Sequence, residues 1–313
     1  MKKILALTLC LLVATTVFAQ QKFVTIATGG TAGTYFPLGG AMADIWNKNI
    51  ARMNASAQST GASIANVNLL KQGSVDIIFV QNDVAKYALD GIELLKGQAY
   101  PDLRGMACLY NETIQIVALE SSGIKSLADL RGKRVSVGAA GSGVEANARQ
   151  ILEAVGLTYN DIKVQYLSFS ESANNLKDGN IDAAFTTAGI PTAAIQDLSV
   201  SKKIVLVPVE KAIADKLIAK YPFYAVTTVP AGTYQNQNAP VQTVAVKSML
   251  AVSSKLSADL VYELLKTMYE NTDRLIAAHA QGKNIRLDSA LEGMSIPLHP
   301  GAEKFFKGKG LLK

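Results

Sequence analysis

The sequence predicts an α/β protein of two lobes, because one unit of secondary structure occurs twice along the chain. The stretch LKQGSVDIIF at residues 70–79 returns as LKDGNIDAAF at residues 176–185. Upstream of each copy an apolar run ends in a turn of small residues, at 29–34 and at 138–143. Each half therefore reads strand, glycine-rich turn, helix, second helix, and a strand that carries an aspartate. Two copies are too few for a solenoid, so we predict two lobes that close over a shared cleft.

The first half contains the signals of alternating strands and helices. The apolar run 24–28 predicts a strand, and the segment 35–49 reads as an amphipathic helix with Pro37 in its first turn, where proline is tolerated. A second small-residue turn, 59–63, precedes the next helix. The other elements expected in this half are helices at 64–71 and 84–89 and strands at 75–80, 103–109 and 114–119.

Capping-box patterns mark two starts in the second half. Ser126 with Asp129 and Ser142 with Glu145 have the spacing at which two orphan amides are satisfied at a helix N-terminus. We further expect a strand at 181–185, a helix opened by Pro191, and one helix from Ala258 to His279. The expected division is a first lobe from residues 22–112 and 228–313 and a second lobe from 113–227. The discontinuous first lobe implies a two-strand hinge, with crossings near Tyr110–Thr113 and Phe223–Val226.

The N-terminus has the features of a secretory signal peptide at residues 1–19. Met1-Lys2-Lys3 is basic, residues 4–17 are almost wholly apolar, and Val17-Phe18-Ala19 supplies small residues at cleavage-type positions. The apolar run is short for a membrane span. We therefore expect a periplasmic protein. Removal of two lysines lowers the net charge from +6 to +4.

Composition argues against several classes of function. The chain has no basic block or aromatic-interleaved basic stripe, so nucleic acid is not expected as a partner. Its two histidines, His279 and His299, lie outside the repeated turns and fit no metal spacing. No phosphate loop, dinucleotide fingerprint or nucleophile elbow occurs. Cys108 lies in an apolar run, as a buried core cysteine does. We expect a monomer that binds without catalysis, cofactor or metal.

Three turns at helix starts are the candidate binding elements. Glycine lets a ligand approach the backbone, and Ser or Thr hydroxyls lie beside amides that have no partner within the helix. Such N-termini are suited to a small anion, although the same residues can serve only as caps. Asp76 and Asp182 occupy the same place in both copies, which favours a scaffold role. The turns contain Thr31, Gly33, Thr34 and Tyr35, then Thr60, Gly61 and Ser63, then Gly141, Ser142 and Gly143.

The segment TGGTAGTYFPLGG at residues 28–40 resembles the opening signature of the TAXI family. These are extracytoplasmic solute-binding proteins of tripartite ATP-independent periplasmic (TRAP) transporters. The likeness continues through residues 60–63, 109–110, 129–135, 141–143 and 179–183. It implies a type II periplasmic-binding-protein fold that captures one small solute. The implied ligands are glutamate, glutamine or a dicarboxylate such as 2-oxoglutarate, delivered to an ion-driven permease.

The resemblance also implies a set of ligand-binding positions. The first lobe would provide Thr31, Gly33, Thr34, Tyr35, Thr60, Gly61 and Ser63. The second would provide Gly141, Ser142, Gly143 and Val144, with Gln81, Tyr110 and Thr187 at the cleft edge.

Two other readings stay open at this point. One is a binding protein of the same fold that serves an ATP-driven (ABC) importer, for a sulfonate or thiamine-precursor type of ligand. The other is a periplasmic enzyme on this fold, for which Cys108 would be the distinctive reactive group.

Overall fold

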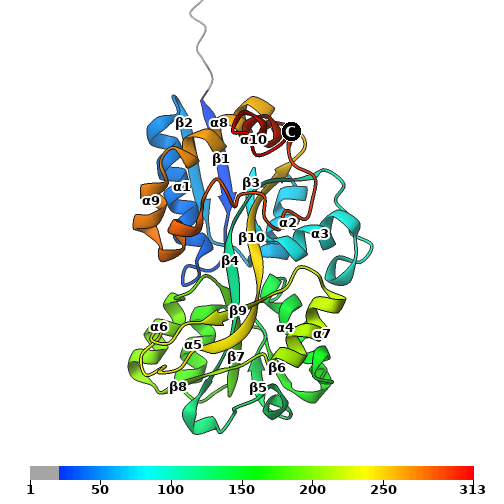
Figure 1. Ribbon diagram of the computed structural model, residues 1–313, viewed down its shortest axis with the longest axis vertical. Helices are drawn as coiled ribbons and strands as arrows, with labels where there is room; N and C mark the ends of the chain where they lie inside the picture. The colour runs from blue at the N-terminus through cyan, green and yellow to red at the C-terminus, as the bar shows by residue number, and fades with distance from the viewer. Residues whose placement is uncertain (1–20) are drawn as a thin grey trace, which may run out of the picture.

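The computed structural model describes residues 21–313 (Figure 1). The expected signal peptide, residues 1–19, lies outside the described residues. Within residues 21–313, no helix is both long enough and apolar enough to cross a membrane.

Two lobes are stacked along the long axis of the molecule, each a sheet covered by helices (Figure 1). The upper lobe contains β1 (Lys22–Ala27), α1 (Tyr35–Asn49), β2 (Met53–Gln58), α2 (Ser63–Lys71), β3 (Ile77–Gln81), α3 (Asn82–Asp90), η1 (Glu93–Leu95), α8 (Ala258–Tyr269), α9 (Thr272–Ala278), η5 (Ala280–Asn284) and α10 (Pro300–Gly308). The lower lobe contains η2 (Glu120–Ser122), η3 (Leu127–Leu130), β5 (Arg134–Ser136), α4 (Gly143–Ala154), η4 (Tyr159–Asp161), β6 (Lys163–Gln165), α5 (Phe169–Lys177), β7 (Ala183–Ala188), α6 (Ala193–Ser201), β8 (Ile204–Val207), α7 (Lys211–Lys220) and β9 (Ala225–Val229).

The sheet topology repeats in the two lobes. In the upper lobe β1 lies between β2 and β3 and is parallel to both, and in the lower lobe β5 lies in the same way between β6 and β7. The repeated aspartates accept the same kind of hydrogen bond, from a backbone amide, in each copy. Asp76 Oδ2 accepts from the amide of Thr25, and Asp182 Oδ2 accepts from the amide of Arg134, both at 2.8 Å. The expected scaffold role of this pair is thereby confirmed.

Two long antiparallel strands, β4 (Leu103–Leu119) and β10 (Val241–Ser253), run through both lobes (Figure 1). The strands expected at 103–109 and 114–119 are one continuous strand. It does not break at Tyr110–Thr113, because β10 pairs with residues 111–113 and with the strand before Tyr110, and β7 pairs with it from Thr113 onward. Its register with β10 shifts between Lys247 and Met249. A bulge of this kind re-aims side chains and bends a strand.

The return crossing differs from the one expected at Phe223–Val226. β9 pairs with the lower end of β10, and Val229, Tyr234 and Val241 pack in a core cluster of the lower lobe. The chain therefore stays in the lower lobe until β10 carries it back. We propose lobe boundaries within β4 and β10 rather than between residues 227 and 228.

The single helix expected from Ala258 to His279 is interrupted. α8 ends at Tyr269 and α9 begins at Thr272, because Asn271 between them has the non-helical angles φ −132 and ψ 37. The break lets α9 turn and pack against α1.

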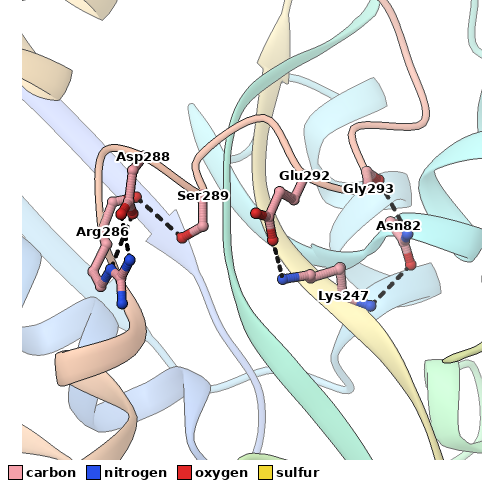
Figure 2. Close-up of polar contacts among 7 residues, drawn as sticks. All are labelled: Asn82, Lys247, Arg286, Asp288, Ser289, Glu292 and Gly293. Atoms are coloured by element: carbon pink, nitrogen blue, oxygen red, sulfur yellow. Dashed lines mark hydrogen bonds and ion pairs between the residues drawn. The ribbon is translucent and has the colours of Figure 1, made fainter. Parts of the chain in front are cut away.

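A C-terminal segment lies across the two crossing strands. Figure 2 shows Glu292 beside Lys247 of β10, with Nζ and Oε2 3.6 Å apart, and Gly293 beside Asn82 at the start of α3. Asn82 Nδ2 donates to the Gly293 carbonyl, and Asn82 Oδ1 accepts from the Lys247 amide, both at 3.0 Å. These bonds hold the end of β3, where Gln81 enters the cleft described below.

Candidate functional site

A small cavity of about 80 Å³ lies between the lobes, where the repeated turns face each other. One water needs roughly 10–15 Å³ of such space, so the cavity has room for a small solute. Four helices of the duplicated units, α1, α2, α4 and α5, direct their N-termini to it. The lining residues are Gly29, Gly30, Gly33, Thr34, Tyr35, Thr60, Gly61, Ala62, Ser63, Gln81, Glu112, Ala139, Ser142, Gly143, Val144, Ser168, Phe169, Thr187 and Ala188.

Thr34 and Ser142 hold the same position, before the first residue of α1 and of α4. Ser142 Oγ caps its helix by accepting from the Glu145 amide at 3.2 Å. Thr34 makes no cap of this kind. Its Oγ1 instead accepts from the amide of Gly189 in the other lobe, at 3.1 Å. One hydroxyl therefore stabilises a helix and the other joins the lobes.

Hydrogen bonds between the lobes close the cleft on several sides. Gln281 Nε2 donates to the carbonyl of Ile190 at 2.6 Å. The amides of Ile64 and Ala65, in the first turn of α2, both donate to the carbonyl of Gly141 at 3.1 Å. The structure is thus a closed state. The two α2 amides and the Gly141 carbonyl hold the lobes together, so they are not free to bind a solute.

A buried polar network joins α3 to α4 beside the cleft. Asn147 Nδ2 donates to Asp83 Oδ2 at 3.1 Å, and Gln150 Nε2 donates to the Tyr87 hydroxyl at 3.0 Å. Tyr224 hydrogen-bonds both Asn147 and Gln150. Burial raises the pKa of Asp83 to about 7.

Glu112, on β4 between the lobes, is the carboxylic acid that lines the cleft and is 2% exposed. Burial raises its pKa to about 8, an effect that nearby Tyr35, Gln81 and Tyr110 side chains partly oppose. The two tyrosine hydroxyls nevertheless make no hydrogen bond of ordinary geometry within the described residues. Gln81 Oε1 and Thr187 Oγ1 are likewise buried without a partner there.

Most of the sequence-predicted positions line this cavity. They are Gly33, Thr34, Tyr35, Thr60, Gly61, Ser63, Gln81, Ser142, Gly143, Val144 and Thr187. Three do not. Thr31 is exposed. The carbonyl of Gly141 is occupied by the amides of α2, and Tyr110 is buried beside Glu112. Whether any of these residues contacts a solute stays a prediction.

Sequence reasoning missed Glu112 and the start of α5 at Ser168 and Phe169. A signal for Glu112 was present, since it is an acid within two apolar runs that form one buried strand. A charge in such a strand is rare unless it is paired or functional. Ser168 with Glu171 is a capping box that could have marked α5 as a further helix start.

The family model described as the NMT1-like family matches residues 26–310. The chain belongs to the NMT1-like family. Among solved structures it is similar to PhnD1 from Prochlorococcus marinus MIT 9301 in complex with methylphosphonate, at 10% identity over 93% of this chain and 99% of that chain, with a TM-score of 0.58. It is also similar to the alkanesulfonate-binding protein SsuA from Xanthomonas axonopodis pv. citri bound to MOPS, at 15% identity over 94% and 81%, with a TM-score of 0.50. A third is a putative L-cystine ABC transporter from Listeria monocytogenes, at 17% identity over 84% and 96%, with a TM-score of 0.51.

These likenesses show that this NMT1-like protein has the two-lobed periplasmic-binding-protein fold, as predicted. The TAXI assignment was wrong, since the matching model is NMT1-like and the structural relatives are ABC-type binding proteins. The glycine turns that carried the resemblance are features of the cleft. Glycine there lets a ligand approach the backbone closely.

The thiol considered for an enzyme lies away from the cleft. Cys108 is 1% exposed in a core cluster of the upper lobe, and burial raises its pKa to about 12. A thiol held protonated in this way is a poor nucleophile. Among residues 21–313, no group of three or more His, Cys, Asp or Glu side chains could hold a metal ion.

Proposed function

We propose that this chain is an extracytoplasmic solute-binding protein that closes its lobes around one small polar solute and delivers it to an ABC importer. The observation that carries the proposal is a cavity with lining from both lobes, at four helix N-termini, with buried polar atoms that lack partners among residues 21–313. Membership of the NMT1-like family and the fold shared with ABC-type binding proteins support it.

The chemistry of the lining favours a solute with an oxyanion group. Helix N-termini offer amides and a positive dipole end to an anion. The proteins that share the fold include one bound to a sulfonate buffer and one bound to methylphosphonate, which support an oxyanion here as well. A carboxylate of a small organic acid or amino acid meets the same requirement.

Closure of the two lobes around a solute would distinguish the loaded protein from the empty one when it meets the importer. A ligand that contacts both lobes favours the closed conformation over an open one. Bending of β4 and β10 between the lobes, where their register shifts, would allow the movement.

Native mass spectrometry of the secreted protein, together with small-angle scattering, tests this function. We expect a bound small solute, and a larger radius of gyration once the solute is removed by partial unfolding and refolding. Adding the solute back should restore the smaller radius. A protein that carries no solute and keeps one radius under all conditions would contradict the proposal.

A further inference from the structure

The charge inside the cleft is of one sign. Glu112 lines the cavity, and no lysine, arginine or histidine is among the residues that line it in the described chain. An acid buried without a cation is costly unless it is protonated or a ligand supplies the opposite charge. A purely anionic solute would place a second negative charge beside Glu112.

Several polar atoms of the cavity lining could take a further partner. Gln81 Oε1, Thr187 Oγ1 and the Tyr35 hydroxyl are buried without hydrogen bonds to residues 21–313, and Gln81 and Tyr35 are 2% and 7% exposed. Native interiors leave few polar atoms in this state. Gln81 Oε1 can only accept a hydrogen bond, and so can the carboxylate of Glu112 when it is ionised. A donor with several N–H groups would satisfy both acceptors.

The N-terminus of α4, which lies beside the Gln81 carboxamide, has the reverse polarity. The first residues of α4, Gly143 and Val144, make no hydrogen bond through their amides within the described residues. Gly143 faces Gln81 so closely that a Cβ on it would collide with the Gln81 carboxamide. The acceptor side and the amide side of the cavity are therefore separated by only a few atoms.

We propose that the solute is a small zwitterion whose protonated amine pairs with Glu112 and Gln81 and whose oxyanion lies at the N-terminus of α4. An α-amino acid has this arrangement, with the two charges on adjacent carbons. This inference rests on the proposed function and specifies the solute class of the same cleft.

The alternative chemistry is a neutral Glu112 that donates its proton to an anion. The two differ in their pH dependence. An amine requires ionised Glu112, so affinity rises between pH 6 and 8.5 as the carboxyl loses its proton. If neutral Glu112 donates its proton to an anion, the affinity falls over the same pH range. Tyr35, Tyr110 and Asp83 are the other titratable groups that act on Glu112, and burial keeps the pKa of both tyrosines well above this range.

Calorimetry on the full mature chain, freed of bound solute, tests the proposal. The probes are L-alanine, L-glutamine and L-glutamate, each against its deaminated counterpart propionate, glutaramate or glutarate. We expect an amine-bearing member to bind at least tenfold more tightly than its counterpart, with an affinity that rises from pH 6 to 8.5. An Asp83→Asn variant should keep this rise. Equal or tighter binding of the counterpart, or an affinity that falls with pH, would overturn the inference.

Glu112→Gln, of nearly the same shape, should reduce affinity for the amine-bearing member by about 10- to 100-fold and leave its counterpart unchanged or improved. Glu153→Gln, on the exposed outer end of α4, is the matched control. Unchanged amino-acid binding in Glu112→Gln would also overturn the inference. If none of the six binds, the solute found by mass spectrometry decides. A solute without a cationic group contradicts this inference alone, and the absence of any solute contradicts the proposed function.

Discussion

The two copies of the repeated unit use one equivalent hydroxyl for different purposes. Ser142 caps α4 within its own lobe, whereas Thr34 leaves α1 uncapped and accepts a hydrogen bond from Gly189 across the cleft. The second copy therefore retains a self-contained helix start. In the first copy the equivalent hydroxyl leaves the helix start uncapped and finds its partner only when the lobes meet. A duplicated motif can thus supply both a stable element and a closure contact with little change in sequence.

The buried acids beside the cleft differ from the repeated aspartates, which accept the same kind of backbone hydrogen bond in both copies. Asp182, in the second copy, pairs with Arg134, whose side-chain hydrogen bond lowers its pKa. In the upper lobe and the crossing strand, Asp83 and Glu112 are buried without a cation among the contacts described, and their pKa values are raised. Polar groups that cost stability are therefore concentrated on the side that meets the other lobe.

The largest effect is expected from filling the space between Gln81 and the N-terminus of α4. In Gly143→Val, the added side chain would meet the Gln81 carboxamide and occupy the space at the N-terminus of α4 where the proposed oxyanion lies. Calorimetry should show a loss of about 100-fold in solute affinity, and scattering should show a protein that stays open. Gly40→Val, at an exposed helical glycine with nothing within 4 Å, is the control. Equal losses in both variants would refute this account of closure.

The buried acid should make stability depend on pH. Burial raises the pKa of Glu112 from 4.5 to about 8, so between these values the folded state binds a proton that the unfolded chain has released. Stability therefore falls as pH rises through this range. Relative to Glu112→Gln, the free energy of unfolding of the wild type should fall by up to about 1.4 kcal/mol per pH unit between pH 5 and 8.

Urea denaturation at each pH measures this difference. Glu153→Gln should follow the wild type above pH 5, because the hydrogen bond from Lys220 lowers the pKa of Glu153. A wild type and a Glu112→Gln variant with parallel pH profiles would show that Glu112 is not protonated in the folded protein.

Thr34→Val tests the hydroxyl group that joins the two lobes. It keeps the shape of the side chain and removes the acceptor for the Gly189 amide. We expect about tenfold weaker solute binding, as one buried hydrogen bond is lost from the closed state, with an unchanged melting temperature of the solute-free open form. Calorimetry and thermal denaturation measure the two quantities. A lower melting temperature with full affinity would reverse the roles assigned to the two hydroxyls.

Ser142→Ala should have the opposite profile and the smallest effect on binding. Loss of the cap costs about 1 kcal/mol of stability, while the amides of α4 stay in place. The same two measurements apply. An affinity loss larger than that of Thr34→Val would show that Ser142 contacts the solute.

Local patterns were sufficient for the units of this fold and for much of the cleft. The repeat at 70–79 and 176–185 predicted two equivalent α/β units, and their topology agrees. Capping at Ser142 and the glycine turns followed from neighbours within a few residues. Such features depend on the chain within one turn or strand, so they can be recognised without the rest of the molecule.

The pairing of distant segments decided what those patterns could not. The segment Tyr110–Thr113 looked like a break, but pairing with β10 and β7 makes it the middle of a crossing strand. This pairing places Glu112 in the lining of the cleft. The return crossing at β10 and the bond from α2 amides to Gly141 likewise join residues far apart in sequence. The sequence by itself therefore determined the two units and their small-residue turns. The tertiary structure alone decided how they meet, because burial and the pairing of a carboxylate depend on side chains that converge only when the lobes close.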